Sequence, residues 1–325
     1  MSNIQEEISR LEEKMMRDIE KILGEIFRTA GAEISRHSIT KADNTGTKEG
    51  LVVRFPGQQI NPTVYPSDYE EMIRNGATAN DIAKAMAERI RENMPQKQGF
   101  TEVPELTKET LTEKAYICVC NTERNKDFLK SVPHEEIEDL SVFVKFRVSD
   151  NAAITITNDI AKNLQLTGAE ILEMARRNTD KQEFSIRTLQ SVLAGAFGAD
   201  FGNGMDQQQP MIPQIFVMSN DNNVDGASCI ASRGALDKAM EKVGEDFYII
   251  PSSRHEILLV PSSLGLGIND LREMIHDVNK TEVSVQDYLS DNLYYYDGMK
   301  LCIAEEASAE KQEASAMAQR HAMAM

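Results

Sequence analysis

The sequence has no tryptophan and no long apolar run among its 325 residues. A helix that crosses a bilayer needs about 20 consecutive apolar residues, and no stretch of this chain approaches that length. The N-terminus, MSNIQEEISRLEEK, is charged and amphipathic and lacks the apolar core of a secretory signal. We therefore expect a cytoplasmic protein that has no membrane partner.

Cysteine is scarce, and each of Cys118, Cys120, Cys229 and Cys302 lies inside an apolar run. A free thiol in such a run behaves as a small apolar side chain, and intracellular thiols usually stay reduced. Cys118 and Cys120 would face the same side of a strand. No histidine lies near them in the sequence, so we expect buried thiols and no metal site.

Positive charge is also in short supply, because the formal net charge is −17 and the pI is about 4.8. Proteins that neutralise nucleic-acid phosphates use clustered lysine and arginine, and this chain has no such cluster. Its acidic residues are interspersed with basic ones instead of forming the blocks of a nucleic-acid mimic. The charge predicts a solvated, soluble surface and no nucleic-acid partner.

The common catalytic and cofactor motifs are absent. The chain contains no Gly-rich phosphate loop, no G-x-S-x-G, no H-E-x-x-H and no C-x-x-C, so we expect no cofactor. The first half of a calcium loop is matched by Asp221, Asn223, Asp225 and Gly226. The twelfth position of that loop is Ser232 where a glutamate is required, and the flanks resemble strands, so the segment predicts a hairpin turn.

The composition is that of a globular protein, with 41% hydrophobic and 27% charged residues. The clearest helix covers residues 2 to about 30, where apolar residues recur at intervals of three and four. This amphipathic helix could bind a partner or form a short coiled coil, but packing on the protein's own core is favoured.

Three regions follow from the element pattern. Residues 1–93 would form the N-terminal helix and a small α+β lobe, with strands at 34–40 and 50–55. A connector rich in Pro, Lys and Glu at 94–113 separates it from a main α+β lobe over 114–303. Residues 304–325 contain no large apolar residue except methionine, which predicts a flexible tail.

The main lobe is predicted to be α+β, with mixed or antiparallel sheets and peripheral helices, because regular βαβ alternation is absent. Strands are expected at 114–120, 141–157, 214–231, 247–260 and 293–303, and a helix at about 185–197. Val142, Val144 and Phe146 alternate with Phe143 and Lys145, which is typical of a sheet with one wetter face. Asp297-Gly298 predicts a type I′ hairpin turn.

The hairpin FYIIPSSRHEILLVPSS, residues 247–263, has two apolar strands that we expect at the centre of a sheet. Its tip would present Ser252, Ser253, Arg254, His255 and Glu256 to solvent as a candidate binding surface. Alternatively, Ser252 or Ser253 could be a nucleophile with His255 as its base and Glu256 orienting the ring. The tip could also be plain turn structure.

Five segments of this chain resemble a known family: INPTVYPSDYEEMIRNG, ICVCNTERNKDFLKSVPHEEIEDLSVFVKF, AAITITNDIAKNL, FYIIPSSRHEILLVPSS and LREMIHDVNKTEVSVQDYLSDNLYYYDG. They are similar to domain of unknown function family 5688, over roughly residues 40 to 303. The resemblance implies an uncharacterised bacterial or mobile-element intracellular protein and no particular activity. We expect a binding or regulatory accessory protein with a protein partner. The alternative is an enzyme of unfamiliar type, such as a hydrolase that uses the hairpin tip.

Overall fold

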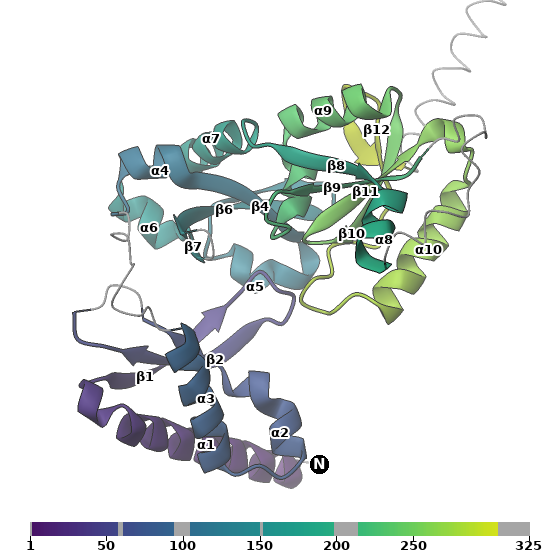
Figure 1. Cartoon of the computed structure of the whole chain (residues 1–325). Coiled ribbons are helices and arrows are strands. Elements are labelled where there is room, and N and C mark those ends of the chain that lie inside the picture. The colour runs from purple at the N-terminus through teal and green to yellow at the C-terminus, as the bar shows by residue number, and fades with distance from the viewer. Residues whose placement is uncertain (1, 58–60, 94–104, 150–151, 198–213, 305–325) are drawn as a thin grey trace, which may run out of the picture. The chain divides into compact units, whose positions relative to one another are not determined.

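The computed structural model describes residues 2–57, 61–93, 105–149, 152–197 and 214–304 (Figure 1). The chain divides into two compact units. The first comprises residues 1–41 and 46–104, and the second comprises residues 42–45 and 105–325. Every sheet in the described residues is antiparallel, which confirms the predicted α+β class.

The first unit packs helices on a three-stranded sheet of order β1-β2-β3. Its elements are α1 (Ser2–Ile26), β1 (Glu33–Thr40), β2 (Thr47–Arg54), β3 (Thr63–Val64), α2 (Glu70–Arg74) and α3 (Ala79–Asn93). Ile19 and Leu23 of α1 are fully buried in one cluster with Met86 and Ile90 of α3. The amphipathic face of α1 therefore packs on the core of its own unit.

The second unit contains a four-stranded and a six-stranded sheet. In the first, β4 (Ala115–Asn121) and β5 (His134–Ile137) flank β6 (Leu140–Ser149), and β7 (Ala152–Thr155) also pairs with β6. The second has the order β13-β12-β10-β11-β9-β8. Its strands are β8 (Phe184–Thr188), β9 (Phe216–Asn220), β10 (Phe247–Ser253), β11 (Glu256–Pro261), β12 (Tyr294–Tyr296) and β13 (Leu301–Ile303).

Helices cover both faces of each of these sheets (Figure 1). They are α4 (Lys108–Lys114), α5 (Lys126–Leu129), α6 (Asn158–Asn163), α7 (Gly168–Thr179), α8 (Leu189–Phe197), α9 (Arg233–Val243) and α10 (Ile268–Thr281). Helix α7 packs on the face of β4 that carries Ile117, and α5 packs on the face that carries Cys118. Strands β10 and β11 are central, as predicted, and Ile249 and Leu259 are fully buried.

Three local predictions were wrong. The helix expected from about 185 begins at Leu189, because Phe184–Thr188 alternates as a strand and pairs with β9. The strand expected at the end of 214–231 is a 3₁₀ helix over Gly226–Ala231. The turn at Asp297-Gly298 is a four-residue loop, because Tyr296 pairs with Leu301. Only Gly298 of that dipeptide has a positive φ, whereas a type I′ turn needs two.

The predicted limits of the three regions stay predictions. Residues 94–104 of the expected connector and residues 305–325 of the expected tail lie outside the described residues. Helix α4 begins within the expected connector, at Lys108. Among the helices that the structure describes, none combines the length and the apolar character that a membrane crossing requires.

Candidate functional site

The end of the β10–β11 hairpin is anchored to the rest of the second unit. Arg254 and His255 form its two-residue turn, and Ser253 pairs with Glu256 across it. The Arg254 N–H donates to the Asp287 carbonyl at 2.8 Å. The five predicted site residues are all half-buried, so the tip presents them to solvent only in part.

Asp225 is the charged centre beneath this turn. Its side chain is only 6% exposed, and its backbone is left-handed with φ 54°. One carboxylate oxygen accepts hydrogen bonds from the Arg254 guanidinium, at 3.0 Å from Nε. The other accepts from Lys145 Nζ at 2.5 Å and lies 3.7 Å from Cys118 Sγ. Burial alone would raise the pKa of the Asp225 carboxyl, but Lys145 and Arg254 lower it to about 2.

His255 joins two loops through its ring. Nδ1 lies 3.3 Å from the Asp225 backbone N–H and therefore accepts from it. The other nitrogen, Nε2, is then the protonated one, and it donates to Asp287 Oδ1 at 3.1 Å. We call Cys118, Lys145, Asp225, Arg254, His255 and Asp287 the Asp225 cluster.

The proposed serine chemistry is not assembled in this arrangement. A general base needs a free ring nitrogen within reach of the nucleophile, and both nitrogens of His255 already have partners. The Ser253 hydroxyl oxygen accepts from the His255 backbone N–H at 3.1 Å instead. Asp287 orients the ring, in the role that the sequence suggested for Glu256.

The half calcium loop does not form a metal site around Asp225. The carboxylate of that residue is taken up by Lys145 and Arg254. The loop is closed instead by Asn220, whose side chain bonds both the N–H and the carbonyl of Val224. Among the residues that the structure describes, no group of three or more His, Cys, Asp or Glu side chains is placed to hold a metal ion.

All four cysteines are buried and free, as predicted. Cys118 and Cys120 lie on the face of β4 that packs against α5. Burial raises the pKa of both thiols, to about 12 for Cys120. They are therefore protonated near neutral pH and are poor nucleophiles.

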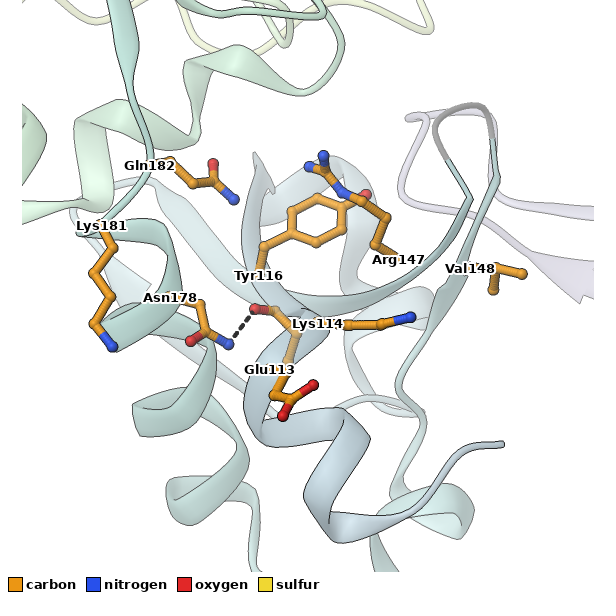
Figure 2. Close-up of a pocket in the computed structure, with 9 residues that line it drawn as sticks. Glu113, Lys114, Tyr116, Arg147, Val148, Asn178, Lys181 and Gln182 are labelled. Atoms are coloured by element: carbon orange, nitrogen blue, oxygen red, sulfur yellow. Dashed lines mark hydrogen bonds between the residues drawn. The ribbon is translucent and has the colours of Figure 1, made fainter. Parts of the chain in front are cut away.

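A pocket of about 460 Å³ lies beside Tyr116 (Figure 2). It lies where β4 begins and α7 ends, and Tyr116, the cross-strand partner of Lys145, links it to the cluster. Its lining consists of Glu113, Lys114, Ala115, Tyr116, Arg147, Val148, Asn178, Lys181 and Gln182. The Asn178 side chain donates to the Ala115 carbonyl at 2.9 Å and fixes one wall.

The pocket carries an excess of positive charge in an otherwise acidic protein. Lys114, Arg147 and Lys181 line it, against one carboxylate from Glu113. None of these three cations has a carboxylate partner in the part of the chain that the structure describes. Sequence reasoning missed this site because its cations come from three distant segments and form no local motif.

We predict that the ion pairs of Asp225 stop stabilising the fold in acid. The folded-state pKa of about 2 lies below the ordinary value of 3.8, so the pairs contribute stability at neutral pH that is lost as pH falls from about 4 to 2. The shift corresponds to about 2 kcal/mol. The loss of stability caused by Asp225→Asn should shrink by about that amount between pH 7 and pH 2 in urea unfolding.

Ile249→Ala is the matched control, because it removes a fully buried aliphatic side chain without changing charge. Its cost, about 2–5 kcal/mol, should be the same at both pH values. A cost of Asp225→Asn that does not depend on pH would contradict the assigned ion pairs.

The comparisons with known proteins give one family. No curated protein and no solved structure matches the chain. A family of unknown function, DUF5688, matches residues 8–298. The match confirms the resemblance seen in the sequence and extends it toward the N-terminus, into α1. The chain therefore belongs to the DUF5688 family.

Proposed function

We propose that the protein is a non-enzymatic binding protein, regulatory or accessory in role, that acts on a protein partner. The partner docks on a surface at the end of the β10–β11 hairpin, which we call the hairpin-end surface and define as Ser252, Ser253, Glu256, Val224 and Val285. We place the protein in the cytoplasm of a bacterium, a setting that its four free, buried cysteines support.

The observation that carries the proposal is the double attachment of the His255 ring. Its two nitrogens hold the loop before Gly226 and the turn at Asp287. Each of these segments exposes a valine, Val224 at 56% and Val285 at 58%. Aliphatic side chains on anchored loops lose little conformational entropy on binding, which favours association with a partner.

The catalytic alternative has less support from the same geometry. A hydrolase that used the hairpin tip would need His255 as a base, but both ring nitrogens are engaged by Asp225 and Asp287. The polar groups of the Asp225 cluster bond mainly to one another. We therefore assign this cluster the task of positioning the two valine-bearing segments.

The test is affinity capture from a lysate of the source organism, followed by mass spectrometry. We compare the wild type with the double variant Val224→Asp/Val285→Asp. Met299→Asp is the matched control, because Met299 is 81% exposed and lies on a different loop. We expect a partner that binds the wild type and the control but not the double variant. All three proteins should have the same melting temperature.

Two outcomes would contradict the proposal. One is a set of captured proteins that does not differ between the wild type and the double variant. The other is labelling of Ser252 or Ser253 by a serine-directed fluorophosphonate, with loss of the labelling in His255→Ala. That result would show an activated serine and would establish the hydrolase alternative.

A further inference from the structure

We propose that the pocket beside Tyr116 binds a small molecule that carries a phosphate or carboxylate group. This site is separate from the hairpin-end surface and does not depend on the function proposed for it. The volume of about 460 Å³ lies within the range of about 300–1,000 Å³ that small-molecule sites occupy.

Charge is the first support for an anionic ligand. Lys114, Arg147 and Lys181 line the pocket together with one carboxylate, that of Glu113, and Figure 2 shows the two lysine side chains ending on opposite sides of the pocket. The nearby carboxylate of Asp225 is already offset by Lys145 and Arg254. The Asp225 carboxylate therefore does not cancel the positive charge of the pocket. This positive charge is a local exception in a protein whose net charge is −17.

Arg147 is the group best placed to bind the anion. Its guanidinium lies 5.1 Å from the centre of the Tyr116 ring, a cation–π contact that holds it against the pocket floor. A guanidinium offers paired N–H donors that match the oxygens of a carboxylate or phosphate. The side chain is half-buried, so an ion pair there is less screened than at the open surface.

Two neutral donors complete the site. Figure 2 shows the ends of Gln182 and Arg147 above the Tyr116 ring, on the same side of the pocket. Burial raises the pKa of Tyr116 above its ordinary value, so the phenol stays protonated and can donate a hydrogen bond. The Asn178 side chain donates hydrogen bonds to the carbonyls of Thr112 and Ala115 and therefore forms part of the pocket wall.

The experiment is isothermal titration calorimetry of the full chain with three probes that share a ring: phenyl phosphate, benzoate and benzyl alcohol. We expect at least one of the two anions to bind and the uncharged alcohol not to bind. Arg147→Gln should lower the affinity for the anion about tenfold or more, because it removes a charge-assisted pair. Lys181→Gln should lower the same affinity a few-fold. Lys181 is exposed, so this substitution should not affect folding.

Arg187→Gln is the matched control, because Arg187 is an exposed arginine on β8 outside the pocket. The affinity of the Arg187→Gln variant for the anion should equal that of the wild type. Binding of only phenyl phosphate or only benzoate identifies the class of anion and supports the proposal. Failure of both anions to bind folded wild type up to about 10 mM would overturn it. Equal affinity of the wild type, Arg147→Gln and Lys181→Gln would overturn it as well.

Discussion

Gly226→Ala is expected to destabilise the protein by about 3 kcal/mol or more, at or above the upper end of the usual cost of overpacking. A Cβ at this position would lie 2.2 Å from Ser219 Oγ, 2.4 Å from the His255 carbonyl oxygen and 2.8 Å from the Asn220 backbone nitrogen. Two of these atoms belong to the backbone and cannot rotate away. The hairpin turn or the 3₁₀ helix that begins at Gly226 would have to move.

The measurement is urea unfolding followed by circular dichroism, with Gly195→Ala as the matched control. Gly195 lies in α8, and a Cβ there would meet nothing within 4 Å. Replacing a helical glycine with alanine stabilises by about 0.5–1 kcal/mol, so the two Gly→Ala changes should have opposite signs. Equal stability of Gly226→Ala and the wild type would mean that the hairpin end does not pack as described.

The strands and their antiparallel pairing could be predicted because their signals are local. Strands β10 and β11 are continuous apolar runs separated by a few polar residues, which is sufficient to indicate a central hairpin. The alternation in β6 also predicted one wetter face, and that prediction was wrong, because Phe143 on the Lys145 face is buried against α5 and Lys145 itself is only 18% exposed. The start of α8 was misplaced because the strand Phe184–Thr188 runs directly into the helix, with no intervening Gly or Pro.

The contacts of the site could not be predicted, because they join residues that are far apart in the chain. Asp225 and Lys145 are separated by 80 residues, and His255 and Asp287 by 32. The polar tip of the hairpin signalled a site, but nothing in the sequence identified these partners. Tertiary packing alone buries Arg254, which therefore serves as a structural ion-pair partner and not as a free surface cation.

The same contacts revise what the tip residues do for stability. Removal of a surface side chain normally changes stability by less than about 0.5 kcal/mol. The sequence places Arg254 and His255 at a solvent-facing tip and so predicts an effect of that size for each. Arg254 is only 21% exposed and is paired with a carboxylate that is 6% exposed. Its removal should therefore cost more than a surface change, and the same reasoning gives a larger effect for Asp225 itself.

Asp225→Asn is expected to destabilise the protein by about 3–5 kcal/mol, the usual cost of removing one member of a buried ion pair. The variant leaves Lys145, at 18% side-chain exposure, and Arg254 close together without their shared counter-charge. Asparagine tolerates the left-handed backbone that Asp225 adopts at φ 54°. The loss can therefore be assigned to charge and not to backbone strain.

Two further variants test that assignment in urea unfolding at pH 7. Glu173→Gln removes an exposed pair with Arg177 on α7 and should cost less than about 1 kcal/mol. Lys145→Met in the Asp225→Asn background removes one uncompensated cation, so the double variant should be more stable than Asp225→Asn alone. A cost of Asp225→Asn no larger than that of Glu173→Gln would show that Asp225 is solvated. The Asp225 cluster would then not be what positions the hairpin end.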